Sequence, residues 1–431
     1  MNFFSLNKKA PEVSFKDAVI NGIAPDRGLY FPTAIRPLPT AFFETIEQYS
    51  DHEIAFKAIH QFVADDIPEE VLKEIIANVL DFDFPLIEID DHTASLELFH
   101  GPTLAFKDVG ARFMAQCLGF FSKDSTAKVT VLVATSGDTG GAVANGFLGV
   151  DGVNVVILYP SGKVSDIQEK QLTTLGKNIT ALEVNGTFDD CQEMVKTAFL
   201  DTDINKMLHL TSANSINVAR WLPQMFYFLF AYKRIKSLQK EIVFSVPSGN
   251  FGNLCAGIIA QQLGMPARHF IAATNVNDVV PQFMVSGSYV PKPSKATISN
   301  AMDVGDPSNF IRIRHIFEND LAQLRRHVSA YSFTDEATKN AMRTLYHEHT
   351  YVADPHGAVA YLGLKKYQQT HSNAYGIFLE TAHPVKFLDV VEDTIRENIE
   401  LPEKIRKLMD KKKKTIKIAN YIEFKNYLFM S

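Results

Sequence analysis

The segment Ser136-Gly137-Asp138-Thr139-Gly140 is repeated almost unchanged 112 residues later as Ser248-Gly249-Asn250-Phe251-Gly252. Each follows a short apolar run, at residues 129–135 and 242–246, and each leads into small, helix-forming residues. A strand, a glycine-rich turn and a helix start together bind anions, because the first helical N–H groups have no partner within the helix and the helix dipole is positive there. These first and second glycine turns therefore predict two anionic groups bound at once.

From about residue 95 onward, β-rich apolar runs alternate with helical stretches. This alternation predicts an α/β fold with two open parallel sheets, one for each glycine turn, covered by helices on both faces. Ligands of such folds lie beyond the carboxyl ends of the strands, so we expect the site in the cleft between the two sheets. The predicted strands are residues 95–99, 129–135, 153–159, 178–184, 242–246, 269–274 and 375–380, and the predicted helices are residues 108–121, 141–148, 165–175, 188–199, 219–234, 253–263 and 334–348.

The chain is expected to have three parts. Residues 1–90 are rich in Pro and Phe and show helical periodicity at 42–49, 53–62 and 69–79, which predicts a mostly helical N-terminal domain. Residues 91–390 would form the α/β core, with a smaller sheet subdomain at about 100–235 and a larger one from the remainder. Residues 391–431 are expected to form a helical tail packed on the core, with the run of lysines at 411–414 as a solvated connector.

Composition limits the classes of function. The chain has 431 residues, 46% of them hydrophobic, and 43 basic against 49 acidic residues give a net charge of −6, which does not favour nucleic-acid binding. Three cysteines without paired spacing indicate buried thiols and neither a disulfide framework nor a metal site. The longest apolar stretch, residues 221–232, contains Pro223 and is too short to cross a bilayer, so it predicts a buried helix. With no signal-like N-terminus, we expect a cytoplasmic protein that binds no membrane.

One lysine lies in apolar surroundings in His100-Gly101-Pro102-Thr103-Leu104-Ala105-Phe106-Lys107-Asp108. Burial would lower the pKa of its amine and make the amine nucleophilic. A lone lysine after an apolar run is also common on amphipathic surfaces, so this pattern alone leaves both interpretations open. Together with two anion-binding turns, however, an amine is what a phosphorylated aldehyde cofactor and an anionic substrate require.

Six segments occurring in order make the sequence recognisable. The chain resembles the threonine synthase family, pyridoxal-phosphate enzymes with the tryptophan synthase β-type fold (fold type II), from its first thirty residues to about residue 390. The segments that carry the resemblance are Gly28-Leu29-Tyr30-Phe31-Pro32, Glu97 to Asp108, Ala134-Thr135-Ser136-Gly137-Asp138-Thr139-Gly140, Ser212-Ala213-Asn214-Ser215-Ile216-Asn217, Val246 to Asn253, and Thr381-Ala382-His383-Pro384.

The resemblance implies the roles of the cofactor-binding residues. Lys107 would form the internal Schiff base, and the turn Gly249-Asn250-Phe251-Gly252-Asn253 would hold the cofactor phosphate through backbone N–H groups. Thr381 would meet the pyridine nitrogen with its hydroxyl; its alternative is a strand-end residue that caps a turn. Asp138 would face the phenolic oxygen of the cofactor, where many relatives on this fold have asparagine; alternatively it caps the following helix.

The resemblance also implies the substrate contacts. The first glycine turn would bind the substrate carboxylate through Thr135, Ser136, Gly137 and Thr139. Asn214, Ser215 and Arg220 would bind the substrate phosphate, for which the planar fork of arginine is suited. Asn214 and Ser215 are also good helix N-cap residues, so that alternative stays open.

Two histidines, His356 and His383, are candidate acid–base groups, but structural roles are favoured for both. His356 is expected at a helix start, where the dipole disfavours a charged imidazole.

The implied reaction converts O-phospho-L-homoserine and water to L-threonine and phosphate, by γ-elimination and then β-addition of water, as the last step of threonine biosynthesis. The main alternative is another elimination enzyme or dehydratase of the same fold acting on serine or threonine. A dinucleotide oxidoreductase is disfavoured because neither turn has the Gly-Xaa-Gly-Xaa-Xaa-Gly spacing. A binding protein without catalysis is the third alternative, disfavoured because the whole residue set is present. We expect no metal, and a monomer or homodimer.

Overall fold

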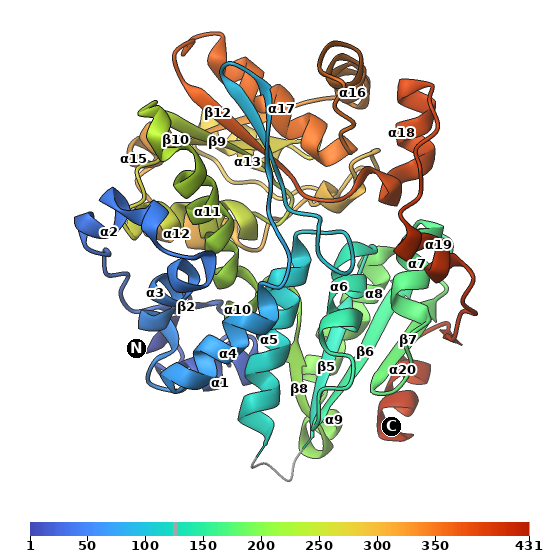
Figure 1. Cartoon of the computed structure of the whole chain (residues 1–431). Coiled ribbons are helices and arrows are strands. Elements are labelled where there is room, and N and C mark those ends of the chain that lie inside the picture. Colours follow the sequence, from blue (N-terminus) through green and yellow to red (C-terminus); the bar gives the residue numbers. More distant parts are fainter. Residues whose placement is uncertain (124–127, 431) are drawn as a thin grey trace. The chain divides into compact units, whose positions relative to one another are not determined.

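Two multi-stranded sheets organise the chain in its computed structural model, which describes residues 1–123 and 128–430 (Figure 1). One compact unit, unit 1, consists of Met1–Phe31, Lys107–Arg220 and Glu400–Ser431, and the other, unit 2, of Pro32–Phe106 and Trp221–Ile399. The predicted boundaries at residues 90 and 390 do not coincide with this division and stay a prediction from the sequence.

Unit 1 is built on a five-stranded parallel sheet with the order β13-β7-β6-β5-β8. Its central strands are apolar along almost their whole length because helices such as α6 and α8 lie against β5 and β6. The strands are β1 Phe3–Ser5, β2 Tyr30–Pro32, β5 Val129–Ala134, β6 Val153–Pro160, β7 Ile179–Val184, β8 His209–Ser212 and β13 Ile416–Ile418, of which β1 and β2 form a separate pair. The helices are α1 Phe15–Asn21, α5 Lys107–Ser122, α6 Asp138–Gly146, α7 Asp166–Thr173, α8 Phe188–Leu200, α9 Thr202–Met207, α10 Val218–Trp221, α19 Glu403–Met409 and α20 Tyr421–Met430.

The C-terminal residues are part of the core of unit 1. Ile418 of β13 and Phe424 and Leu428 of α20 are buried in one cluster with Leu158 and Leu182 of the sheet. The tail predicted as helical therefore also contributes an edge strand. The lysine run at 411–414 lies between α19 and β13 and is exposed, in agreement with its prediction as a solvated connector.

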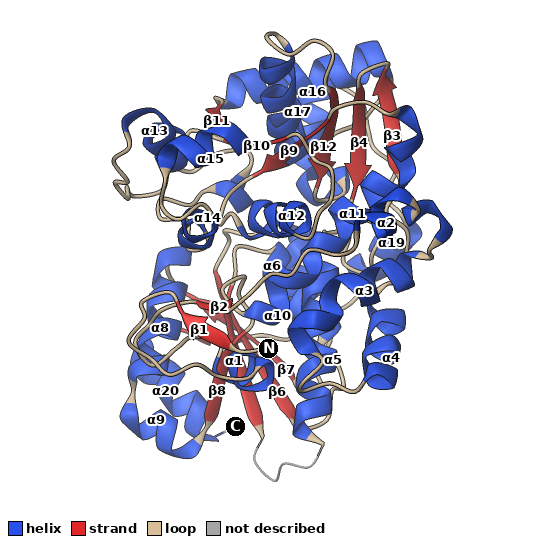
Figure 2. Ribbon diagram, turned by 90° about the vertical axis from the view of Figure 1, so that its left-hand side faces the viewer, coloured by secondary structure: helices blue, strands red, loops and turns tan. Residues whose placement is uncertain are grey.

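Unit 2 is built on a six-stranded sheet with the order β11-β10-β9-β12-β4-β3, parallel except for β3, which pairs antiparallel with β4 (Figure 2). The strands are β3 Leu86–Asp90, β4 Thr93–Glu97, β9 Ile242–Pro247, β10 His269–Thr274, β11 Val328–Ser332 and β12 Tyr375–Glu380. The α-helices are α2 Thr40–Glu44, α3 Asp51–Val63, α4 Glu69–Val79, α11 Met225–Ile235, α12 Gly252–Gln262, α13 Val279–Ser286, α14 Phe310–Ile316, α15 Leu321–His327, α16 Asp335–His349, α17 Pro355–Gln368 and α18 Leu388–Ile395. The 3-10 helices are η1 Ile46–Gln48, η2 Leu222–Gln224, η3 Lys236–Leu238, η4 Asn300–Met302 and η5 Pro384–Phe387.

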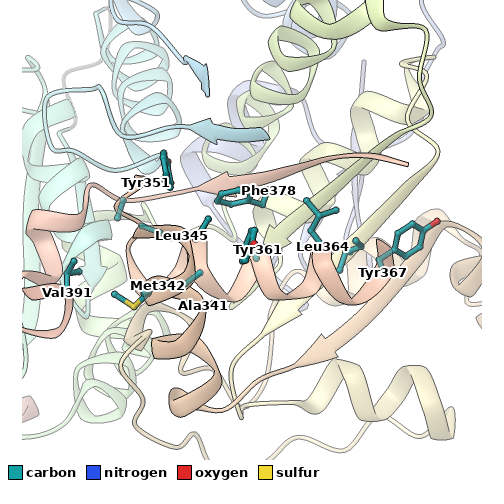
Figure 3. Packing of buried hydrophobic residues seen from close by; sticks show 14 of the residues in the cluster. Ala341, Met342, Leu345, Tyr351, Tyr361, Leu364, Tyr367, Phe378 and Val391 are labelled. Carbon is teal, nitrogen blue, oxygen red and sulfur yellow. The ribbon is translucent and has the colours of Figure 1, made fainter. Parts of the chain in front are cut away.

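Helix α17 packs on the sheet of unit 2 through its apolar side chains (Figure 3). The ring of Tyr361 meets that of Phe378 on β12 with a centroid distance of 5.6 Å, and Leu364 is fully buried beside them. This packing fixes the helix start at Pro355 and the strand end at Glu380 within one rigid core, and both carry residues of the candidate site.

Two helix predictions were wrong in detail. The helix expected at 219–234 is divided into α10, η2 and α11, because Pro223 lies in η2 and has no N–H to continue an α-helical ladder. The helix expected at 42–49 is divided at Thr45 into α2 and η1. The apolar stretch from Trp221 onward is buried, as predicted.

Candidate functional site

The first glycine turn connects β5 to α6 in unit 1. Gly137 has a φ of +135°, which side chains rarely allow, and it is the N-cap of α6 without a side-chain hydrogen bond at that cap. The hydroxyl oxygen of Thr135 accepts from the N–H groups of Gly137 (2.9 Å) and Gly140 (2.8 Å). The side chain of Thr135, which was predicted to contact substrate, thus stabilises the turn.

Asp138 is the first residue of α6 and is buried. Its Oδ1 accepts from Nε2 of Gln168 at 2.9 Å, while Oε1 of Gln168 accepts from the N–H of Ser165, at the N-cap of α7. The alternative that Asp138 caps its helix is wrong, because Gly137 occupies the cap. Gln168 was missed from the sequence, although Ser165-Asp166-Ile167-Gln168 has the spacing of a capping box.

The segment from Ser212 to Arg220 lies beside the end of β5. Nδ2 of Asn214 donates to the carbonyl of Ala134 at 3.3 Å, directly before the first glycine turn. Oδ1 of Asn214 is buried and has no hydrogen-bond partner among residues 1–123 and 128–430. A buried amide oxygen without such a partner can accept a hydrogen bond from a bound ligand.

Asn217 directly precedes the short helix α10, and its Oδ1 accepts from the N–H of Ala219 at 3.0 Å. Asn217 therefore occupies the cap position that the alternative interpretation gave to Asn214 or Ser215. Arg220 is buried, and its Nη1 donates to the carbonyl of Ala213. The arginine therefore fixes the backbone that precedes Asn214.

The second glycine turn connects β9 to α12 in unit 2. The N–H of Ser248 donates to the carbonyl of Ala273 at 2.8 Å, which anchors the turn to β10. Phe251 adopts a left-handed conformation with a φ of +63° and is the N-cap of α12, without a side-chain hydrogen bond. Of the first helical N–H groups, that of Leu254 donates to Oδ1 of Asn253 at 2.9 Å, which leaves those before it to meet an anion.

Asparagines on either side of this cap hold the second glycine turn in shape. Asn253 donates from Nδ2 to the carbonyl of Pro247 at 2.8 Å. Oδ1 of Asn250 accepts from the N–H of Ser308 at 3.1 Å, and its backbone carbonyl accepts from the N–H of Asn309 at 3.2 Å. The contact with residues 308–309 was not predicted, since no local pattern indicates it.

The residues directly before Lys107 and the Thr381 segment, predicted separately, lie side by side in unit 2. The N–H of Phe106 donates to the carbonyl of Thr381 at 2.9 Å, and the N–H of His383 donates to that of Leu104 at 3.1 Å. Leu104 has a φ of +59°, which turns the chain into this pairing. Lys107 follows at once as the first residue of α5.

Both histidines have structural roles, as favoured from the sequence. Nδ1 of His383 accepts from the N–H of Val385 at 3.2 Å and so caps η5. His356 lies at the start of α17, as predicted, next to its N-cap Asp354. Its Nδ1 is 2.7 Å from Oδ1 of Asp354.

A buried pair of carboxyl groups lies directly before Thr381. Oε1 of Glu380 accepts from the N–H of Asp354 at 2.5 Å, and Oε2 of Glu380 has no partner in the described part of the chain. Burial, and then the charge of Asp354, raise the pKa of Glu380 well above its ordinary value. Both residues were missed, because a single acidic residue at a strand end or before a helix has many possible roles.

Comparison with known proteins identifies the family. A model described as pyridoxal-phosphate dependent enzyme matches residues 89–377, and models of the threonine synthase N terminus and C-terminal region match residues 2–80 and 357–427. The threonine synthase of Escherichia coli (strain K12) is 43% identical over 411 residues, which cover 95% of each chain. The chain belongs to the threonine synthase family.

Solved structures of threonine synthases agree with this assignment. The crystal structure from Escherichia coli has a TM-score of 0.93 at 41% identity and covers 100% of each chain. The pyridoxal-phosphate-bound threonine synthase of Brucella melitensis has a TM-score of 0.92 at 32% identity, over 99% of this chain and 98% of that one. Maize serine racemase, at 16% identity and a TM-score of 0.55, shares the fold alone.

The residues present fit pyridoxal phosphate, the cofactor of this family. In unit 2 an uncapped helix start follows the second glycine turn, which suits a phosphate. A hydroxyl-bearing residue, Thr381, directly follows the central strand β12 and lies beside the segment that leads to Lys107. The donor set is thus an amine, backbone N–H groups and a hydroxyl, as this cofactor requires.

The described residues give three further results. Among residues 1–123 and 128–430, no group of three His, Cys, Asp or Glu side chains is placed to hold a metal ion, and no helix is long and apolar enough to cross a membrane. Cys117, Cys191 and Cys255 are buried and unpaired, which confirms the prediction of core thiols. Burial raises the pKa of the Cys191 and Cys255 thiols to about 12, so neither is a reactive thiolate.

Proposed function

We propose that the chain converts O-phospho-L-homoserine and water to L-threonine and phosphate. The single observation that supports this most is the backbone pairing of Phe106 with Thr381, which places the residue before Lys107 beside the hydroxyl-bearing residue that follows β12. Pyridoxal phosphate, when bound, supplies a conjugated ring that takes up negative charge from a substrate carbon.

Lys107 is the proposed catalytic residue. Its Nζ holds the cofactor at rest and, once released by the substrate amine, takes the proton from the substrate Cα. Removal of a proton from Cβ then weakens the bond between Cγ and the ester oxygen, and phosphate leaves. A proton is then added to Cγ, which becomes the methyl carbon, the hydroxyl group of water adds at Cβ, and a proton returns to Cα; the remaining proton of the water is taken up by the released phosphate.

The backbone N–H groups of residues 249–253, at the start of α12, are proposed to hold the cofactor phosphate. The hydroxyl of Thr381 would meet the pyridine nitrogen, and because a hydroxyl does not keep that nitrogen protonated, the ring would be a weaker electron sink than with a carboxylate there. Asp138 would face the phenolic oxygen, with Gln168 fixing its carboxylate from the other side.

Substrate contacts are proposed for two neighbouring parts of unit 1. The N–H groups and hydroxyls of the first glycine turn, at Ser136, Gly137 and Thr139, would bind the substrate carboxylate, with Thr135 bracing the turn. Asn214, Ser215 and Arg220 would bind the ester phosphate, supported by the position of Asn214 against the end of β5. We further propose a cytoplasmic enzyme that acts as a monomer or homodimer.

The test is a product assay on the purified, cofactor-loaded protein. We expect threonine and phosphate from O-phosphohomoserine, and little ammonia from serine. Lys107→Ala should lose turnover and the visible absorbance of the lysine-bound cofactor together, whereas Lys163→Ala, at an exposed lysine of the same unit, should keep both. Borohydride reduction should label the peptide that contains Lys107. Full activity of Lys107→Ala, or ammonia from serine as the main product, would contradict the proposal.

A further inference from the structure

Asp354 is buried and forms hydrogen bonds with two parts of unit 2. Its Oδ2 accepts from the N–H of Ala382 at 3.2 Å, directly after Thr381, while its own N–H donates to Glu380, directly before Thr381. Its Oδ1 accepts from the N–H of His356 and faces Nδ1 of the same histidine. Asp354 therefore holds both neighbours of Thr381 and one side of the imidazole.

The other side of the imidazole defines its tautomer. Nε2 of His356 is 3.2 Å from the N–H of Ala301, and since a backbone N–H only donates, Nε2 is the acceptor. The ring proton is then on Nδ1 and points to Asp354. The ring is 2% exposed and lies 4.8 Å from the Phe387 ring, so it has no room to turn freely.

Ala301 belongs to η4, and this short helix lies directly against the second glycine turn. A Cβ built on Gly249 would come within 2.8 Å of the carbonyl oxygen of Ala301 and 2.9 Å of Cα of Met302. Only a residue without a side chain fits this space, so the backbones of Gly249 and η4 pack closely and a displacement of Ala301 is expected to reach Gly249.

We propose that Asp354 and His356 are positioning residues that fix the spacing between Thr381 and the second glycine turn. The inference rests on the proposed function, in which Thr381 meets the pyridine nitrogen and the second glycine turn meets the phosphate. Both groups belong to one cofactor molecule, in which a short arm of the pyridine ring carries the phosphate, so their protein contacts must stay within a limited range of separations. The hydrogen bonds run from Ala382 through Asp354 and His356 to Ala301, all within unit 2.

The contacts of Asp354 with its buried neighbours support this arrangement. Burial and the charge of Asp354 raise the pKa of Glu380 well above its ordinary value, and the side chain of Asp354 accepts from the N–H groups of His356 and Ala382. Gly357 lies directly against the carboxyl group of Glu380, since a Cβ at Gly357 would collide with Oε2 of Glu380. The side chains of Asp354 and Glu380 are thus enclosed and are held in a single conformation.

Two substitutions of His356 test the contacts of its two ring nitrogens separately. His356→Asn keeps a donor near the position of Nδ1 and removes the acceptor for Ala301. His356→Gln keeps an acceptor near the position of Nε2 and removes the donor to Asp354. His269→Asn, at a second buried histidine of unit 2 that is bonded to Ser329, is the matched control.

We expect the two variants to change different properties of the enzyme. His356→Asn should release pyridoxal phosphate from diluted holoenzyme about tenfold faster, as expected for one buried N–H left unpaired, with little change in the absorbance maximum of the bound cofactor. His356→Gln should shift that maximum and lower kcat, with cofactor release closer to the original rate. His269→Asn should change only the melting temperature.

Each variant is decisive by itself. Unchanged cofactor release in a folded His356→Asn, or an unchanged absorbance maximum and kcat in a folded His356→Gln, would overturn the inference. Should one variant fail to fold in a melting experiment, the other still decides. A borohydride label away from Lys107 would instead contradict the proposed function, so the two failures are distinguishable.

Discussion

The backbone N–H of Phe106 donates to the carbonyl of Thr381, and this bond joins two segments that lie far apart in the sequence. Because the bond uses backbone atoms, the side chain of Thr381 can be changed without removing it. The role of the hydroxyl can therefore be tested separately from the role of the strand end.

Thr381→Val removes the hydroxyl and keeps the shape of the side chain. We expect kcat to fall about tenfold or more, since one hydrogen bond to the cofactor is lost, and the absorbance of the bound cofactor to shift. Thr381→Ser, which keeps the hydroxyl, should remain within a few-fold of the original kcat. Equal kcat values and spectra for all three proteins would show that the hydroxyl has no part in the reaction.

Gly137→Ala should harm both folding and substrate binding. A Cβ at this position would come within 2.4 Å of Cδ of Gln168, which holds Asp138, and the φ of +135° already excludes most side chains. Gly149→Ala is the matched control, since Gly149 also has a positive φ, +76°, but open space around the added atom. We expect Gly149→Ala to lower the free energy of unfolding by about 1 kcal/mol with unchanged KM.

For Gly137→Ala we expect a larger loss in urea unfolding and a KM for phosphohomoserine raised about tenfold or more. If the two alanine variants behave alike in both measurements, the close contact with Gln168 affects neither the free energy of unfolding nor KM.

Arg220→Ala should weaken substrate binding much more than cofactor binding. The guanidinium fixes Ala213, which precedes the proposed phosphate ligands Asn214 and Ser215, and its planar fork suits a phosphate ester. Arg220→Lys keeps the charge and loses the fork, so it should restore only part of the affinity. Steady-state KM and cofactor titration provide the comparison. Equal losses for substrate and cofactor would indicate a folding defect instead of a binding role.

His269 should make the protein sensitive to acid. Burial lowers the pKa of His269 to about 4, whereas in an unfolded chain a histidine has a pKa of about 6.5. Between these values the unfolded chain binds the extra proton and the folded chain does not, so the contribution to stability is complete above pH 6.5 and is lost as the pH falls toward 4. The loss should be on the order of 3 kcal/mol over this range.

His269→Gln should flatten this part of the stability curve, because glutamine does not titrate and its amide can still bond to Ser329. The measurement is the free energy of unfolding in urea at several pH values, with His52→Gln, at an exposed histidine, as the control. The same acid slope in His269→Gln and the original chain would exclude His269 as its source.

The sequence predicted the internal strands of both sheets and missed the edges. The seven predicted strands are β4, β5, β6, β7, β9, β10 and β12, none of them at a sheet edge, whereas the four edge strands, β3, β8, β11 and β13, were not predicted. Internal parallel strands are covered on both faces and appear as continuous apolar runs. Edge strands are short and carry polar residues, as Glu88 and Asp90 do in β3, so their composition is close to that of loops.

Helix α17 was missed for a related reason, because its first two turns are buried on all sides and show little helical period. In the site, the sequence indicated the residues with motifs of their own, such as Lys107, Thr381 and the two glycine turns. It did not indicate Gln168, Glu380 or Asp354, since their roles depend on tertiary contacts between distant segments.

The position of β12 affects how the chain is synthesised. This strand is the last of the unit 2 sheet to leave the ribosome, yet it lies in the middle, between β9 and β4. Until then the nascent chain holds two incomplete half-sheets with open inner edges, which are prone to mispairing and to capture by chaperones. Thr381 follows β12 directly, so ribosome-bound fragments that end before this strand should not retain the coenzyme.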